Sequence, residues 1–262
     1  MQLLNNEFTL DKFFDRLRNS PRSVLMLDYD GTLSPFTPDR DNAIPYVGVR
    51  DRLEELMKSS RTEVIIISGR DIDRLKELLN LKSLPQMWGC HGAERYIPNL
   101  GHRLMIGQKI RDGLLEIKKW SKKYNLLEYT EFKPSGCAFH WRGKSEREAE
   151  KIMRLIWDDW GAEASRYNLN ISNFDGGIEI CAKGFNKGIA VDKIMSANSP
   201  DFAMAYLGDD LTDEDAFKAL GERGLKVLVR EKSRDSLADI QIIPPDELLE
   251  FFDKWIELTS KN

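Results

Sequence analysis

The feature that most constrains the fold is a near-continuous apolar run at residues 23–29 (SVLMLDY). A strand that is apolar on both faces is typical of a parallel sheet covered by helices on each side. A second such run, residues 63–68 (EVIIIS), lies between two stretches of helical periodicity at 49–58 and 71–79. Strands and helices that alternate in this way predict an α/β fold with right-handed crossover connections.

The middle of the chain follows a different pattern. Its segments are predicted helices at 106–124 and 146–159 and predicted short strands at 128–133, 137–142, 166–172 and 177–181. The buried-strand pattern resumes at 202–207. We therefore expect a doubly wound core formed by residues 1–96 and 183–262, interrupted by an inserted α+β cap domain at 97–182. Such a cap would lie over the carboxyl edge of the sheet, where ligands of open α/β folds bind.

The composition excludes several classes of protein. The chain has 262 residues, with 39 basic and 43 acidic side chains, and its net charge of −4 gives no reason to expect a nucleic-acid partner. Its three cysteines form no Cys-x-x-Cys pair, which argues against a disulfide framework or a zinc knuckle. No stretch is apolar enough for a signal peptide or a membrane span. We expect a cytoplasmic protein without a membrane partner.

The segment Asp28-Tyr29-Asp30-Gly31-Thr32 ends the first apolar run. Residues i and i+2 at the end of a strand project to the same side, so two carboxylates converge there. Gly31 allows a sharp turn and a close approach to a ligand. A surface turn would explain an isolated Asp-x-Asp-Gly equally well, but the four apolar residues before it favour a functional site.

A second acidic cluster follows the strand predicted at 202–207. Five of the seven residues 209–215 carry carboxylates. Such a cluster favours a divalent cation such as Mg²⁺, which prefers oxygen ligands. A capping box formed by Thr212 and Asp215 at a helix start is the competing interpretation. It leaves Asp209 unexplained, because this residue lies at the strand end.

Two weaker signals concern an anionic ligand. Ser68-Gly69-Arg70 ends the second apolar run and precedes a helix, so its hydroxyl and backbone N–H groups could cradle a phosphate. Lys187 lies at the beginning of a predicted helix, where a cation is unfavourable unless it neutralises an anion. A loop serine and a solvated lysine are the ordinary alternatives.

In this order, the motifs resemble those of the haloacid dehalogenase-like phosphatases, and within them most closely the trehalose-6-phosphate phosphatase family. The matching segments are Asp28-x-Asp30-Gly31-Thr32, Ser68-Gly69-Arg70, Gly89-x-His91-Gly92, Glu131-x-Lys133, His140-x-Arg142, Gly184-x-x-Lys187-Gly188 and Gly208-Asp209-Asp210-x-Thr212-Asp213-Glu214-Asp215. The resemblance covers roughly residues 23–230 and implies a Rossmann-like core with an inserted cap. One departure concerns Cys181-Ala182, which follow Glu179-Ile180 where the family usually has Arg-Pro.

The resemblance also implies roles. Asp28 would be the nucleophile that forms an aspartyl-phosphate, and Asp30 the general acid and base. Ser68 and Lys187 would hold the phosphoryl oxygens. Magnesium would be the cofactor, held by Asp28, the backbone carbonyl of Asp30, and Asp209. The residues expected to bind the substrate are Gly69, Arg70, His91, Glu131, Lys133, His140, Arg142 and Glu179.

The expected substrate is trehalose 6-phosphate, and a trehalose-6-phosphate synthase of the same pathway is the expected partner. On strand periodicity, Glu131 and Lys133 share one face, as do His140 and Arg142, so one wall of the cap could read sugar hydroxyls. The missing Arg-Pro leaves another sugar phosphate open, such as sucrose phosphate or a mannosyl-phosphoglycerate. A catalytically silent phosphosugar sensor or a receiver-like Mg²⁺-binding module is the alternative outside enzymes.

Overall fold

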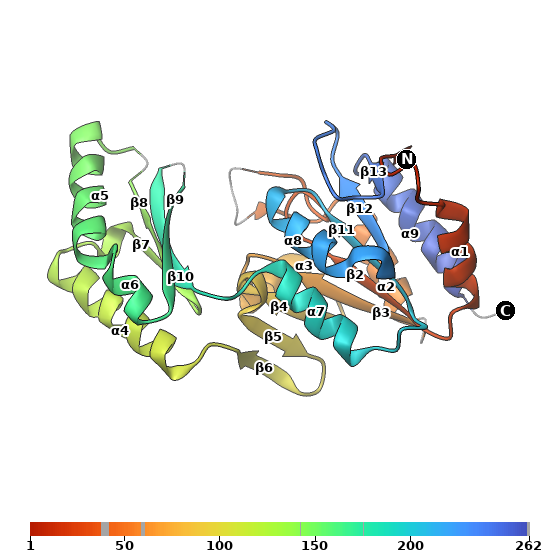
Figure 1. Cartoon of the computed structure of the whole chain (residues 1–262), viewed down its shortest axis with the longest axis horizontal. Helices are drawn as coiled ribbons and strands as arrows, with labels where there is room; N and C mark the ends of the chain where they lie inside the picture. The colour runs from red at the N-terminus through yellow and green to blue at the C-terminus, as the bar shows by residue number, and fades with distance from the viewer. Residues whose placement is uncertain (38–41, 59–60, 142, 175, 261–262) are drawn as a thin grey trace. The chain divides into compact units, whose positions relative to one another are not determined.

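The computed structural model describes residues 1–37, 42–58, 61–141, 143–174 and 176–260. The chain forms two compact units (Figure 1). Unit 1 consists of Met1–His102 and Asn186–Asn262, and unit 2 of Arg103–Phe185. The division of the chain into a core and a cap with boundaries at 97 and 182 stays a prediction; the compact unit in the middle of the chain begins and ends a few residues later.

A nine-stranded, mostly parallel sheet forms the centre of unit 1. Its strands in spatial order are β1 (Gln2–Leu3), β13 (Ile240–Ile242), β12 (Leu225–Val229), β11 (Ala203–Gly208), β2 (Ser23–Leu27), β3 (Thr62–Ile67), β4 (Gln86–Gly89), β5 (Glu94–Ile97) and β6 (Gly101–Leu104). The strands from β13 to β4 run parallel, whereas β1 is antiparallel to β13 and β5 is antiparallel to β4. Every residue of β2 and β11 is buried, as the apolar runs predict.

Helices cover both faces of this sheet (Figure 1). One face packs against α1 (Leu10–Asn19), α2 (Val49–Lys58), α3 (Ile72–Leu79) and α9 (Asp246–Thr259). The other face packs against α7 (Lys187–Ala197) and α8 (Leu211–Leu220). Alternate side chains of a strand point to opposite faces, so Leu25 and Leu27 join the first core and Val24 and Met26 the second. The doubly wound α/β architecture is thus confirmed.

Unit 2 contains a separate antiparallel sheet in the order β7 (Thr130–Lys133), β8 (Gly136–His140), β10 (Gly177–Ala182) and β9 (Leu169–Phe174). Its helices are α4 (Gln108–Lys123), α5 (Glu146–Trp160) and the short α6 (Glu163–Arg166). Ser145 caps α5 in a capping box with Glu148. The antiparallel α+β character predicted for the middle of the chain is confirmed.

Two details differ from the sequence analysis. Residues 94–97 and 101–104, for which the sequence analysis predicts no strand, form β5 and β6 and extend the large sheet. The capping box at Thr212 and Asp215 is wrong, because α8 begins at Leu211 with Asp210 as its N-cap, and Asp213 accepts from the backbone N–H of Asp210. In the described part of the chain, no helix has the length and apolar character needed to span a bilayer.

Candidate functional site

Asp28 and Asp209 lie close together at the point in the large sheet where successive strands begin to be added on the opposite side. The chain moves outward from β2 to β3 and β4 on one side, and from β11 to β12 and β13 on the other. Asp28 follows β2 and Asp209 follows β11, and these two strands are parallel neighbours. The backbone N–H of Asp28 donates to the carbonyl of Leu207 at 2.9 Å. The pairing of β2 with β11 therefore continues to the residue that carries the carboxylate. This topological switch point is where open α/β sheets bind ligands.

Two glycines allow the carboxylates to approach the backbone. Gly31 has a φ of +78°, and a Cβ there would lie 2.1 Å from Oδ2 of Asp209. A Cβ on Gly208 would lie 2.3 Å from Cγ of Asp213. Side chains at these positions would displace Asp209 and Asp213, so glycine is required on steric grounds, and at Gly31 also by the left-handed backbone.

Lys187 is the cation of this cluster. It is the first residue of α7, behind the N-cap Asn186, whose side chain accepts from the N–H of Ile189. Its Nζ lies 2.7 Å from Oδ1 of Asp28 and 2.7 Å from Oδ1 of Asp213, and all three side chains are at most 4% exposed. The buried ion pairs explain why a lysine occurs at a helix N-terminus.

Asp213 has both carboxylate oxygens engaged by the protein. Oδ1 accepts from Lys187 and from the hydroxyl of Tyr206 at 2.6 Å, and Oδ2 accepts from the backbone N–H groups of Asp209 and Asp210. Asp213 therefore anchors the loop that carries Asp209. Sequence reasoning left its role open.

The charges of the cluster are out of balance. Burial raises the pKa of Asp28 well above its usual value; Lys187 opposes this shift, while Asp213 and Asp209 add to it. Burial, with Asp213 next, raises the pKa of Asp209 to about 7. Burial disfavours the charge of Lys187, but Asp28 and Asp213 outweigh it and raise its pKa above the usual range. Three carboxylates facing one lysine call for a further cation.

The donor set fits a hard divalent ion. Asp28, Asp209 and Asp213 each offer an oxygen, and these oxygens lie within 4.8 Å of one another. Oδ1 of Asp209 is buried and has no hydrogen-bond partner among the described residues. An unpaired buried carboxylate oxygen is costly unless it meets a cation, and carboxylate oxygens suit Mg²⁺.

The loop after β3 lies beside this cluster at the same edge of the sheet. Ser68 is buried, and its Oγ accepts from the N–H of Arg70 at 3.1 Å. The carbonyl of Ser68 accepts from the N–H of His91 at 2.9 Å, and a Cβ on Gly69 would lie 2.6 Å from Nε2 of His91. His91 has a φ of 54°. The loop after β4 thus packs its imidazole directly on the glycine of the Ser-Gly-Arg segment.

Asp30 and Arg70 form a two-pronged ion pair. Nε of Arg70 donates to Oδ2 of Asp30 at 2.7 Å, and Nη2 donates to Oδ1 at 2.5 Å. The guanidinium also lies over the ring of Tyr29, 5.7 Å from its centroid. The motifs predict separate roles for these two residues, and nothing in their spacing predicts that they pair.

The polar residues predicted for the cap lie on one face of the sheet in unit 2. Glu131 and Glu179 both pair with Ala138, and Lys133 pairs with Gly136, so all three point to the same side. Nζ of Lys133 lies 2.9 Å from Oε1 of Glu179.

Nε2 of His140 lies 3.1 Å from Oε2 of Glu131, so His140 belongs to the same face. By register this face also carries Cys181, which pairs with Gly136. Arg142 lies outside the described residues.

Sequence reasoning missed two arginines that hold the acidic loop. Arg230 donates to the carbonyl of Asp209 at 3.2 Å. Arg234 donates to the carbonyl of Asp210 at 2.8 Å and pairs with Glu214. Both follow β12 in a mixed-charge stretch that resembles any solvated surface, so the sequence gives no signal for them. The sequence did contain a signal for the role of Tyr206, because a tyrosine in a fully buried strand requires a hydrogen-bond partner for its hydroxyl.

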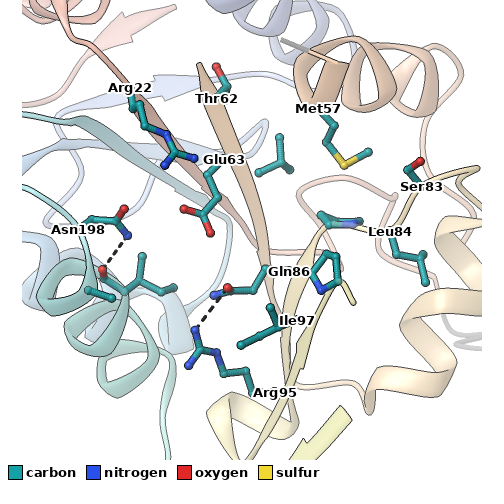
Figure 2. Close-up of a pocket in the computed structure, with 15 residues that line it drawn as sticks. Arg22, Met57, Thr62, Glu63, Ser83, Leu84, Gln86, Arg95, Ile97 and Asn198 are labelled. Atoms are coloured by element: carbon teal, nitrogen blue, oxygen red, sulfur yellow. Dashed lines mark hydrogen bonds between the residues drawn. The ribbon is translucent and has the colours of Figure 1, made fainter. Parts of the chain in front are cut away.

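A cavity of about 660 Å³ opens at the opposite edge of the large sheet. Figure 2 shows Arg22, Glu63 and Gln86 around it, at the amino ends of β2, β3 and β4. Gln86 accepts a long hydrogen bond of 3.4 Å from Arg95 there. None of the predicted site residues lines this cavity, so it is separate from the acidic cluster.

Comparison with known proteins gives consistent matches. The family model of trehalose-phosphatases matches residues 26–241. A trehalose-phosphate phosphatase of Mycobacterium ulcerans is 29% identical over 245 residues, which cover 88% of this chain and 60% of that protein. The chain thus spans less than two thirds of that relative's length.

Solved structures support the fold. The C-terminal domain of a C. albicans trehalose-6-phosphate phosphatase matches with a TM-score of 0.71 at 23% identity, over 98% of each chain. A haloacid dehalogenase-like hydrolase from B. subtilis matches with a TM-score of 0.57 at 14% identity, over 88% of this chain and 99% of that one.

Proposed function

Because this chain belongs to the trehalose-phosphatase family, we propose that it hydrolyses trehalose 6-phosphate to trehalose and inorganic phosphate. The observation that carries the proposal is the cluster of Asp28, Asp209 and Asp213 around Lys187, in which Asp209 is half-buried and the other side chains are buried. Phosphate monoesters are very stable in water, and their hydrolysis depends on positioning and on stabilising negative charge. A nucleophilic carboxylate beside a buried ammonium suits that task.

In the proposed first step, a carboxylate oxygen of Asp28 attacks phosphorus and the bond from phosphorus to the sugar oxygen breaks. Asp30 donates its proton to the departing sugar oxygen, so that an alcohol leaves rather than an alkoxide. In the second step, Asp30 accepts a proton from water, which attacks phosphorus and releases Asp28. Ser68 and Lys187 hold the phosphoryl oxygens, and the short contact between Lys187 and Asp28 supports this geometry.

Asp28, the backbone carbonyl of Asp30, and Asp209 would hold Mg²⁺ in this scheme. When bound, the ion supplies positive charge that offsets the carboxylates and the phosphate dianion. Asp213, whose oxygens are occupied by protein donors, orients the loop instead. The orphaned oxygen of Asp209 supports this assignment.

Glu131, Lys133, His140 and Glu179 would recognise the sugar, together with Arg142. Carboxylates and cationic or imidazole nitrogens on one sheet face offer acceptors and donors for hydroxyl groups, which supports a carbohydrate-reading surface. Gly69 and His91 would shape the loop that contacts the phosphate. A synthase of trehalose 6-phosphate as partner and a reducing, cytoplasmic location stay predictions; the three cysteines are free.

Phosphate release tests the proposal. The purified protein is incubated with Mg²⁺ and a panel of trehalose 6-phosphate, sucrose phosphate, a mannosyl-phosphoglycerate and 4-nitrophenyl phosphate. We expect trehalose 6-phosphate to give the highest kcat/KM and Asp28→Asn to abolish turnover of every ester. Faster turnover of another sugar phosphate would refute the substrate alone. Binding of trehalose 6-phosphate without turnover of any ester would indicate a sensor.

A further inference from the structure

We propose that Arg70 is a positioning residue that fixes the carboxylate of Asp30, and that it acts on the reaction through Asp30 rather than by holding the phosphoryl group. The inference rests on the function proposed above and refines the substrate-binding role that its motif implies. Two donors from one rigid guanidinium, at 2.7 and 2.5 Å, fix both the position and the plane of the carboxylate.

Arg70 is itself held in place. Its side chain is 8% exposed, and its guanidinium lies over the ring of Tyr29, whose hydroxyl donates to the carbonyl of Ala43 at 2.7 Å. Its backbone N–H donates to Oγ of Ser68, and its carbonyl accepts from the N–H of Cys90 at 2.7 Å. The backbone and guanidinium of Arg70 are therefore held in place, as is required of a group that orients the carboxylate of Asp30 by two hydrogen bonds (the fork).

Asp30 needs such support because it follows the strand instead of lying within it. The structure gives it one isolated bridge to Ser34, next to Gly31 in the left-handed region. Its side chain is 28% exposed, which leaves it accessible to a ligand. The fork uses one lone pair of each carboxylate oxygen, and the outer lone pairs stay available for the proton that Asp30 donates and regains.

The two possible roles of Arg70 predict different effects on different esters. A sugar oxygen must be protonated as it leaves, whereas 4-nitrophenolate departs without a proton. Since kcat/KM reports the steps up to departure of the leaving group, a misplaced Asp30 lowers kcat/KM for the sugar ester only. Loss of a phosphoryl-binding group lowers it for both esters, because both carry the same phosphoryl group.

The experiment compares the wild type with Arg70→Met, Arg70→Lys, Asp30→Asn and the double variant Arg70→Met/Asp30→Asn. The substrates are trehalose 6-phosphate, or the sugar phosphate that the wild type prefers, and 4-nitrophenyl phosphate, at saturating Mg²⁺. General acid catalysis contributes about 10²–10⁴-fold, so we expect Arg70→Met to lower kcat/KM about 100-fold for the sugar ester and less than about threefold for the aryl ester. Arg70→Lys keeps the charge but loses the fork, and should behave like Arg70→Met.

A double-mutant cycle and a burst measurement complete the test. If Arg70 acts through Asp30, the double variant is no slower than Asp30→Asn alone. Because Asp30 also activates water, Arg70→Met should release a burst of 4-nitrophenol equal to the enzyme concentration, as the aspartyl-phosphate accumulates.

Equal losses for both esters, restored by Arg70→Lys, would refute the positioning role and return Arg70 to phosphate binding. If Arg70→Met does not fold, Arg70→Lys decides between the two roles, because it keeps the positive charge and a side chain of similar length. A wild type that hydrolyses neither ester contradicts the proposed function, and this role with it.

Discussion

At the scale of single residues, the balance of charge around Lys187 dominates. One ammonium contacts two carboxylates in a site that is at most 4% exposed, and a third carboxylate lies within 4.8 Å of them. Such a cluster gains little stability as a whole, because each charge was better solvated in water. Removing one member is different, since the remaining charges stay buried without a partner.

We expect Lys187→Met to destabilise the protein by about 3–5 kcal/mol, the usual cost of leaving a buried charge unpaired. Urea unfolding in the absence of Mg²⁺ measures it. The matched control is Lys119→Met, since Lys119 pairs with Glu116 on an exposed helix surface and should change stability little. A Lys187→Met variant as stable as the wild type would contradict the buried ion pairs of Lys187 with Asp28 and Asp213.

Arg234 offers a second residue-scale prediction. It donates to the carbonyl of Asp210 and pairs with Glu214, so it orients the loop that carries Asp209 without being a candidate ligand. Losing such a supporting group typically costs about 10–100-fold in metal affinity. We expect Arg234→Gln to raise the Mg²⁺ concentration needed for half-maximal activity by about tenfold, with kcat at saturating Mg²⁺ nearly unchanged.

The control for that variant is Arg16→Gln. Arg16 also donates to backbone carbonyls, those of Pro200 and Phe202, but it does not contact the acidic loop. An unchanged Mg²⁺ requirement in Arg234→Gln would show that the loop holds its shape without this arginine.

At the scale of elements, the residues predicted to bind the sugar lie on the sheet of unit 2, whereas the acidic cluster lies at strand ends of unit 1. Glu131 lies on the polar face of β7, beside His140 and on the same side as Lys133. We expect Glu131→Gln to raise KM for the sugar phosphate about tenfold, the loss expected for roughly 1.4 kcal/mol of contact to a charged group, and to leave 4-nitrophenyl phosphate unaffected.

Steady-state kinetics with both esters measures the effect of Glu131→Gln on KM. Glu116→Gln, on the exposed surface of α4, is the control. Equal effects of Glu131→Gln on the two esters would mean that this face does not read the sugar.

The elements also show how far sequence reasoning reaches. The apolar runs identified β2, β3 and β11 because a strand that is buried on both faces consists mostly of apolar residues. The segments Glu94–Ile97 (ERYI) and Gly101–Leu104 (GHRL) were missed, since short, polar strands at a sheet edge have no distinctive periodicity. Motif order singled out Asp28, Asp209 and Lys187, which lie together in the structure; their catalytic roles stay predictions. The fork from Arg70 to Asp30 depends on how two loops 40 residues apart meet, which spacing does not encode.

At the scale of the whole molecule, the acidic cluster links stability to pH. The pKa of Asp209 is raised to about 7 in the folded protein, against a usual value of 3.8. The folded state therefore holds its proton in a range where the unfolded state has lost it, and stability falls as pH rises from about 4 to about 7. The raised pKa of Asp28 acts in the same direction.

Without metal, we expect the unfolding temperature to be lower at pH 8 than at pH 5.5. Mg²⁺ should raise it at pH 8 and much less at pH 5.5, because the ion binds the ionised carboxylates and displaces their protons. Scanning calorimetry with and without Mg²⁺ measures both effects. In Asp209→Asn the pH dependence and the response to Mg²⁺ should both shrink, and an unaltered response would place the ion elsewhere.

The position of β2 in the large sheet has a consequence for the growing polypeptide. β2 and β3 are translated before unit 2, but the neighbour of β2 on its other side is β11, which is translated only after the whole of unit 2. Until then, one edge of this mostly apolar strand has no partner for its N–H and C=O groups, and such an edge can pair with other chains. Chaperone capture of the nascent protein should therefore be most needed while residues 103–185 are being made, and should end once β11 emerges.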